Sequence, residues 1–320
     1  MRCLLLTFDC LPRRWLGCYG SLDSTTRGFD RLAAAGTTFE NAVSTDVRSE
    51  AKTTAGFQWI PEGNRPHTLA AGRPLSFPSF HLASHDQPVP KLTGRRRPES
   101  KLSHELHQAS TWMRDQNGPS LAWVRHPGLQ LASDPISQDH VPLLLEQQAL
   151  IDDELDAFLD EWVDCADERW TFVLTASRGV LRARDSARRR SDPAPSISDD
   201  LARVPLFILE SRGESFGRRQ LQLLPTTALA ATIPAVNGSS SESLAAHLER
   251  LDPARFVPIQ GDDGAIAVRT SDWLFVRSNE PDREAGEGLL FRKPEDVSDV
   301  FDVRSVQADE AIRLDALIGA

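Results

Sequence analysis

The sequence predicts an α/β fold in which helices cover both faces of a mainly parallel sheet. Two patterns predict this fold. Short apolar runs, typical of strands buried on both faces, recur along the chain, and segments with apolar residues at every third or fourth position separate them. Strands that alternate with helices form parallel sheets, because each helix returns the chain to the same edge. The 320 residues are enough for one large domain and a small C-terminal part.

The local patterns assign the elements in order. We expect strands at residues 4–8, 37–39, 120–124, 170–175 and 204–209. We expect helices at residues 26–35, 101–113 and 140–163 and over the last twenty residues, and a hairpin at residues 265–270 and 273–277. Residues 44–97 are rich in Pro, Gly, Ser and Thr and are expected to be irregular, and residues 182–200 are expected to form an exposed loop.

A Ser-rich turn at residues 237–241 marks a domain boundary in the sequence. We therefore expect an α/β domain at residues 1–238. Residues 239–320 are expected to form a small α+β subdomain that contains the hairpin and the terminal helix.

The composition excludes several classes of function. The net charge is −10, from 36 basic and 46 acidic residues, so a nucleic-acid partner is not expected. The first apolar run is too short to span a membrane and lacks a signal-peptide cleavage site, so we expect a cytoplasmic protein with no membrane partner. The four cysteines include no CxxC pair, which favours reduced thiols over a zinc site.

The first forty-odd residues carry the most specific pattern in the chain. It consists of the runs LLLTFDC (4–10), LGCYG (16–20), FDRLA (29–33), GTTF (36–39) and Asn41-Ala42. This order of motifs resembles the start of the sulfatases of the alkaline-phosphatase superfamily. Segments 269–276 and 289–303 resemble later parts of the same family. The resemblance implies an alkaline-phosphatase-like fold for most of the chain.

The resemblance also implies a metal-dependent active site. In sulfatases a divalent cation, usually calcium, holds the sulfate. Its ligands are an Asp pair after the first strand and an Asp followed by His or Asn after a later strand. Here Asp9 matches the first ligand, but Cys10, Ser177 and Arg178 stand where the other three are expected. We therefore expect no cofactor, and Ca²⁺ or another divalent cation only if the site is unexpectedly functional.

The nucleophile of the family is a formylglycine made from the first residue of a C/S-x-P-x-R motif. Counting forward from Asn41-Ala42 reaches Ser49, which is followed by neither the Pro nor the Arg. Counting back from residues 69–73, which resemble another family motif, reaches residues 61–65, which include no nucleophile. His126 follows the strand at 120–124 and resembles a substrate-binding His, although a surface or supporting His is the simpler interpretation.

Three functional hypotheses follow. The first is a sulfatase-like pseudoenzyme that binds a protein partner or an anionic small molecule, with Arg178 paired to Asp9 in place of the metal. The second is an active sulfuric- or phosphoric-ester hydrolase whose site draws on residues 44–97, including His67, His81 and His85. The third is a structural subunit of a larger assembly.

Three acidic pairs also invite a metal interpretation, namely Asp152-Asp153, Asp199-Asp200 and Asp262-Asp263. The first lies on the helix expected at residues 140–163 and is interpreted as a solvated face. The second precedes a strand, where it can cap a short helix, and the third is typical of a turn. We therefore do not expect these pairs to bind a metal.

Overall fold

The computed structural model describes residues 2–22, 24–48, 57–60, 67–70, 73–83, 101–130, 136, 138–163, 170–180, 197–211, 216–237, 243–278 and 284–318. Its central sheet has seven strands in the order β10-β2-β9-β8-β1-β7-β6. β6, β7, β1 and β8 run parallel to one another, as do β2 and β10, and β9 is antiparallel to both of its neighbours. The expectation of a mainly parallel sheet is therefore confirmed.

The central strands are built from the apolar runs of the sequence. They are β1 (Arg2–Cys10), β2 (Thr37–Val43), β6 (Ser79–Ala83), β7 (Ser120–Gly128), β8 (Trp170–Arg178), β9 (Leu206–Glu210) and β10 (Arg218–Pro225). β1 lies near the middle and is buried along almost its whole length, because strands flank it and helices cover both faces.

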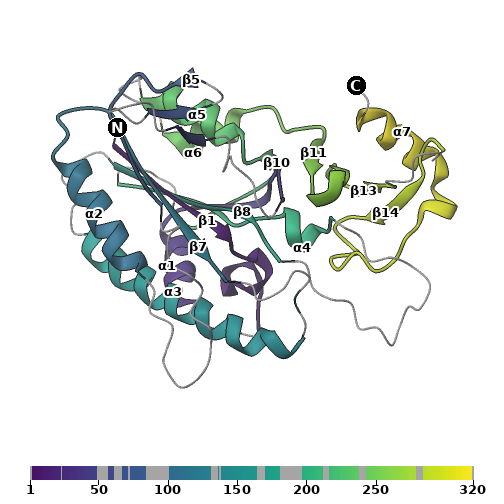
Figure 1. Cartoon of the computed structure of the whole chain (residues 1–320), viewed down its shortest axis with the longest axis horizontal. Coiled ribbons are helices and arrows are strands. Elements are labelled where there is room, and N and C mark those ends of the chain that lie inside the picture. Colours follow the sequence, from purple (N-terminus) through teal and green to yellow (C-terminus); the bar gives the residue numbers. More distant parts are fainter. Residues whose placement is uncertain are drawn as a thin grey trace.

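Helices cover both faces of this sheet, as expected (Figure 1). One face carries α1 (Arg27–Ala35), α2 (Leu102–Arg114) and α3 (Val141–Val163), and the other carries α5 (Ala228–Asn237) and α6 (Leu244–Arg250). Apolar side chains from the sheet and from all five helices form one continuous core. Among the described residues, no helix is both long enough and apolar enough to cross a bilayer.

The segment expected to be irregular contains strands. Besides β6, it holds a three-stranded sheet of β3 (Phe57–Ile60), β4 (His67–Ala70) and β5 (Arg73–Pro74). The ring of Phe57 is fully buried against Trp123 of β7, at 5.9 Å between ring centroids. The expectation was wrong at these strands because strands of two to five residues are too short to show a hydrophobic period.

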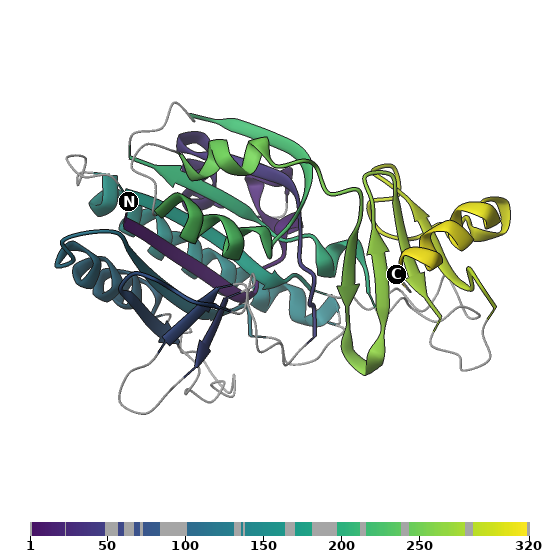
Figure 2. The same ribbon diagram turned by 90° about the horizontal axis from the view of Figure 1, so that it is seen from above.

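A second sheet forms the C-terminal part of the molecule (Figure 2). It is an antiparallel sheet of β11 (Val257–Gln260), β12 (Ile266–Arg269), β13 (Trp273–Arg277) and β14 (Gly288–Arg292), followed by α7 (Ala308–Ile318). The expected hairpin and terminal helix are confirmed. One face of this sheet packs against the main domain through Leu274 and Phe291, and α7 covers the other face through Ala311 and Leu314.

The boundary expected after residue 238 falls within residues 238–242, which lie outside the described residues. Leu244 and Leu248 of α6 pack into the core of the central sheet, whereas the C-terminal sheet begins at Val257. The division of the chain at residue 238 stays a prediction.

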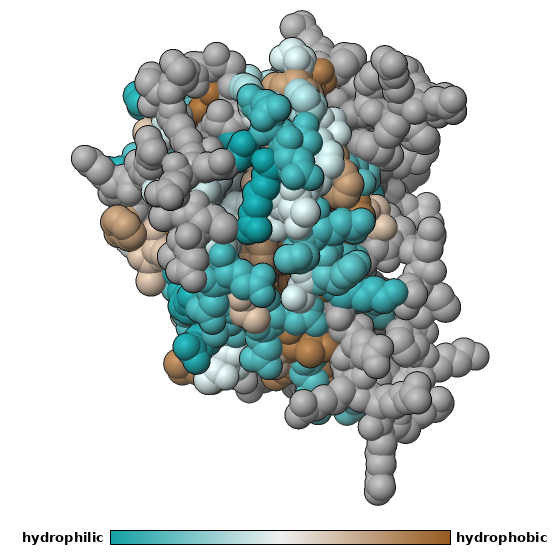
Figure 3. All heavy atoms as spheres, turned by 90° about the vertical axis from the view of Figure 1, so that its left-hand side faces the viewer, coloured by the Kyte–Doolittle hydropathy of each residue, from teal (hydrophilic) through white to brown (hydrophobic). Residues whose placement is uncertain are grey.

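The carboxyl ends of the central strands face the C-terminal sheet, with the short helix α4 (Asp199–Ala202) between them (Figure 1). The remaining short helices are η1 (Arg13–Trp15), η2 (Gly17–Tyr19), η3 (Gln138–His140), η4 (Asp262–Gly264) and η5 (Arg304–Val306). On the opposite side, which carries α2, the coloured surface is mostly hydrophilic and its apolar atoms are scattered (Figure 3). The carboxyl edge is therefore the place to search for a site.

Candidate functional site

The carboxyl edge brings most of the expected site residues together. β1 lies between β7 and β8, and the three parallel strands are aligned so that Phe8 pairs with His126 and Cys10 pairs with Arg178. Parallel strands end at the same edge, so Asp9, Cys10, His126, Ser177 and Arg178 meet there. Ser49 lies outside the described residues, so its expected position as the nucleophile stays a prediction.

Asp9 forms an ion pair with Arg125, a residue that the sequence did not single out. Nε of Arg125 lies 2.6 Å from Oδ1 of Asp9, and both side chains are partly buried. Arg125 of β7 pairs with Thr7 of β1. Because side chains alternate between the two faces of a sheet, Thr7, Asp9 and Arg125 point to the same face. The pair with Arg178 that we expected stays a prediction, and a guanidinium from another strand already holds the carboxylate.

Cys10 is buried and its thiol has a local partner. Sγ donates to the carbonyl oxygen of Gly179, at 3.2 Å, while the carbonyl oxygen of Cys10 accepts from the amide of Leu129, at 2.9 Å. These bonds tie β1 to the segments that follow β7 and β8. A protonated thiol engaged in this way cannot substitute for a carboxylate ligand.

His126 is buried, so the surface interpretation was wrong. Its ring stands edge-on to Phe8, at 5.6 Å between centroids, and its Nδ1 accepts a hydrogen bond of 3.0 Å from the amide of Gly128. Burial lowers the pKa of His126 to about 4, so the ring is neutral at physiological pH. A neutral ring with this packing supports the turn at the end of β7.

The residues at this edge do not fit a calcium ion. Calcium takes six to eight oxygen ligands, several of them from carboxylates. Asp9 offers one carboxylate, which Arg125 neutralises, and Cys10, Ser177 and Arg178 add none. Within the part of the chain that the structure describes, no group of three or more His, Cys, Asp or Glu residues is placed to hold a metal. We therefore derive no metal-dependent step.

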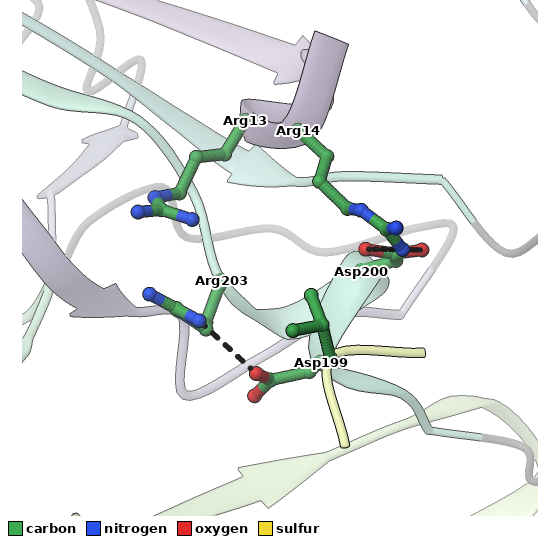
Figure 4. A pocket seen from close by; sticks show the side chains of 6 residues that line it. Arg13, Arg14, Asp199, Asp200 and Arg203 are labelled. Carbon is green, nitrogen blue, oxygen red and sulfur yellow. Dashed lines mark hydrogen bonds and ion pairs between the residues drawn. The ribbon is translucent and has the colours of Figure 1, made fainter. Parts of the chain in front are cut away.

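A small pocket opens at the same edge, between η1 and α4. It is lined by Arg13, Arg14, Asp199, Asp200, Arg203 and Val297 and encloses about 20 Å³ (Figure 4). Arg14 bonds Asp200 with its Nη1, at 3.0 Å from Oδ2, and Arg203 bonds Asp199. Burial lowers the pKa of Arg13, and the nearby charge of Arg203 lowers it further. These arginines were not expected from the sequence, because the segments that supply them are far apart in the chain.

Asp199 connects this pocket to a buried charge network. Its carboxylate lies 2.8 Å from Nε of Arg269 and 3.7 Å from Nζ of Lys293, and Lys293 also pairs with Asp299. Burial alone would raise the pKa of Asp199, but Arg269, Lys293 and Arg203 outweigh it and lower the value to about 2. For Asp299 burial outweighs Lys293 and raises the pKa to about 6. The network joins α4 to the C-terminal sheet.

Two acidic pairs behave differently from their sequence interpretation. Asp152 is buried rather than solvated, and its Oδ1 accepts from the amide of Phe29, at 2.9 Å, in the first turn of α1. Asp199 begins α4, but the side chain of Ser198 provides the cap by accepting from the amide of Leu201. Asp152 thus stabilises the N-terminus of a neighbouring helix.

Comparisons with known proteins agree on the fold. No known family model and no curated protein matches the sequence. A structure described as a 2-O GAG sulfatase is 15% identical, with a TM-score of 0.69 over 99% of this chain and 92% of that one. A protein solved with its substrate D-glucosamine-2-N,6-O-disulfate is 10% identical, with a TM-score of 0.67 over 99% and 96%.

A protein of the alkaline phosphatase superfamily from Vibrio parahaemolyticus is 15% identical, with a TM-score of 0.59 over 99% of this chain and 85% of that one. Identities this low establish the architecture and not the chemistry. Because the matches cover nearly the whole chain, they include both the central sheet and the C-terminal sheet. The chain therefore has the fold shared by sulfatases and other proteins of the alkaline phosphatase superfamily.

Proposed function

We propose that this protein is a catalytically degenerate sulfatase-like protein whose function is to bind an anionic small molecule or a protein partner. The observation that carries the proposal is the ion pair between Arg125 and Asp9. Asp9 is the one acidic residue that matches the metal site of the resembled family. With Arg125 Nε at 2.6 Å, its charge is neutralised by a guanidinium rather than being available to a cation.

The neighbouring positions support the same proposal. Cys10 contributes a buried thiol, Ser177 a buried hydroxyl and Arg178 a guanidinium. In the resembled family, acidic and histidine side chains at these positions hold and assist a metal. A metal-dependent hydrolase uses the cation both to grip the ester and to activate the nucleophile. Without that cation, positive side chains at the edge still attract an anion but do not activate a nucleophile.

The test combines metal analysis with turnover. The purified full chain is incubated with Ca²⁺, Mg²⁺, Mn²⁺ and Zn²⁺, freed of unbound ions by gel filtration, and analysed for bound metal. Hydrolysis of an aryl sulfate and an aryl phosphate is then measured. We expect less than one metal per chain and no turnover above the buffer rate.

The variant Asp9→Asn and the matched variant Glu310→Gln, which removes a partly buried carboxylate on α7, serve as controls. Stoichiometric metal together with turnover, both lost in Asp9→Asn and retained in Glu310→Gln, would overturn the proposal. That result would instead support an active sulfuric- or phosphoric-ester hydrolase with a non-standard site. A well-folded chain without turnover in any metal supports the proposal and contradicts the hydrolase.

A further inference from the structure

We propose that the pocket lined by Arg13, Arg14 and Arg203 binds the terminal phosphate or sulfate group of a ligand whose remaining part lies in solvent. The inference goes beyond the proposed function, because it places an anion site apart from Asp9 and holds whether or not the chain is a catalyst. It rests on the positions, partners and charges of these three side chains.

The fold places these arginines around one opening. Arg13 and Arg14 lie in η1, directly after β1, and Arg203 follows α4 and forms a bridge with Val43. In Figure 4 the guanidinium groups of Arg13 and Arg203 lie on one side of the pocket and that of Arg14 lies on the other. The side chains of Arg13 and Arg203 are mostly buried, with 12% and 14% of their surface exposed, whereas Arg14 is 41% exposed.

The charge balance of the pocket is positive. Three arginines and two aspartates line the pocket. Both carboxylates already have cationic partners other than Arg13 and Arg203. Asp199 is held by Arg269 and Lys293 as well as by Arg203, and Asp200 is held by Arg14. Positive charge gathered in a partly buried recess attracts anions, even in a chain whose net charge is −10.

The acidic side chain nearest to Arg13 does not neutralise this excess. Glu40 of β2 accepts from Arg13 through Oε2 and from Arg219 through Oε1, so one carboxylate serves two guanidinium groups. Arg13 also lies over the ring of Tyr19, with Cζ 4.1 Å from the ring centroid. These contacts fix the plane of the Arg13 guanidinium and leave its charge only partly balanced.

Arg13 and Arg203 retain donors that no described group accepts. The Nε–H of each is buried and has no hydrogen-bond partner within the described part of the chain. The terminal nitrogens of Arg203 donate to Asp199, to the carbonyl oxygen of Glu40 at 2.8 Å and to Oδ1 of Asn41 at 2.8 Å. Two like charges in one recess repel each other, and an arriving oxyanion would relieve this repulsion by pairing with the guanidinium groups.

The size of the pocket restricts the ligand. The enclosed volume of about 20 Å³ is enough for one water molecule, so only one or two oxygen atoms of an anion fit inside. Planar guanidinium groups match the paired oxygens of a phosphate or sulfate group. The recess therefore selects a terminal oxyanion, and the rest of its ligand stays outside in solvent, next to the exposed lining residue Val297.

The test measures anion binding to the full chain by isothermal titration calorimetry at low ionic strength. Inorganic phosphate, inorganic sulfate and acetate are the probes, and acetate distinguishes a carboxylate site from a tetrahedral oxyanion site. We expect saturable binding of phosphate or sulfate, weaker binding of acetate, and at least a tenfold loss of affinity in Arg13→Gln. The Arg13→Lys variant keeps the charge and loses the planar guanidinium group, so its anion affinity is expected to lie between those of the wild type and Arg13→Gln.

Three further variants make the result decisive. Arg313→Gln removes an exposed arginine paired with Glu310 on α7 and should bind like the wild type. Arg125→Gln tests whether the anion binds beside Asp9 instead. Loss of anion binding in Arg125→Gln, with binding retained in Arg13→Gln, would overturn the proposal. If Arg13→Gln does not fold, the more exposed Arg14→Gln replaces it, with an expected loss of at least threefold. Absence of saturable phosphate and sulfate binding to the wild type would also overturn the proposal.

Discussion

Lys293→Met tests whether the buried charge network holds the C-terminal sheet to the main domain. Lys293 is fully buried, and its ammonium pairs with Asp299 and lies 3.7 Å from Asp199. Methionine fills a similar volume without the charge. The substitution therefore isolates the electrostatic role of the ammonium group and leaves most of the packing in place.

The expected loss is large because the substitution leaves a buried carboxylate without its cation. Removal of one partner of a buried ion pair costs about 3–5 kcal/mol. Asp199 keeps Arg269 and Arg203, so the loss should come from Asp299, which is 1% exposed. In the double variant Lys293→Met/Asp299→Asn neither charge remains, and the total loss should fall to about 2 kcal/mol or less.

The assay is urea unfolding at pH 7.5, followed by tryptophan fluorescence and by far-UV circular dichroism. The double-variant cycle should give a coupling energy of about 1–3 kcal/mol between Lys293 and Asp299. A matched exposed pair, Arg313 and Glu310 on α7, should give less than about 0.5 kcal/mol. A loss below about 1 kcal/mol in Lys293→Met, or a double variant as unstable as the single one, would refute the reasoning.

Further predictions concern pH and one turn. Burial raises the pKa of Asp299 from 3.8 to about 6, so its ionised form destabilises the fold above pH 6 and this cost disappears as the pH falls toward 3.8. Acidification from pH 7.5 to 5 should therefore stabilise the wild type by about 1–3 kcal/mol relative to Asp299→Asn, and parallel curves of unfolding free energy against pH would contradict this. His126 acts with the opposite sign: its pKa is lowered from 6.5 to about 4, so its contribution is complete above pH 6.5 and is lost as the pH falls through 4. His126→Asn should lose less stability than the wild type between pH 7 and pH 4, and a greater loss would show that the ring is not buried as a neutral group. Gly128→Ala should cost at least about 3 kcal/mol or prevent folding, because its φ is +71° and a Cβ would lie 2.1 Å from a backbone oxygen. Gly118→Ala, with nothing within 4 Å of the added Cβ, is the control and should change the stability by less than about 1 kcal/mol in the same urea assay.

The core elements could be predicted because their burial follows a simple period. β1 is a continuous apolar run, and α3 repeats apolar residues at every third or fourth position. β10 and α5 were not predicted. The first half of β10 is mostly exposed at an edge of the sheet, and α5 contains Pro234, so neither shows the pattern of a typical buried strand or helix.

The candidate site could be predicted only in part. The positions of Asp9 and Arg178 followed from the ends of two apolar runs, since parallel strands end at one edge. The partner of Asp9 did not follow, because Arg125 lies 116 residues away and meets it only through the register of β1 and β7. Asp152 was misinterpreted for a related reason: the sequence predicts both helices but not that the N-terminus of α1 packs against Asp152 on α3.

Under the proposed function, the side chains at the carboxyl edge favour a change of function over a simple loss of it. Simple decay of a metal site replaces carboxylates with arbitrary side chains, whereas this edge carries guanidinium groups at Arg125 and Arg178 and again in the pocket at Arg13 and Arg203. In a metal-dependent site carboxylates hold a cation, and the cation holds the anion. Arginines can hold the anion directly, so binding can persist after activation of a nucleophile is lost. Such binding should weaken as ionic strength rises from about 10 mM to 0.5 M, because salt screens charges at a partly exposed edge, and calorimetry with phosphate can measure this.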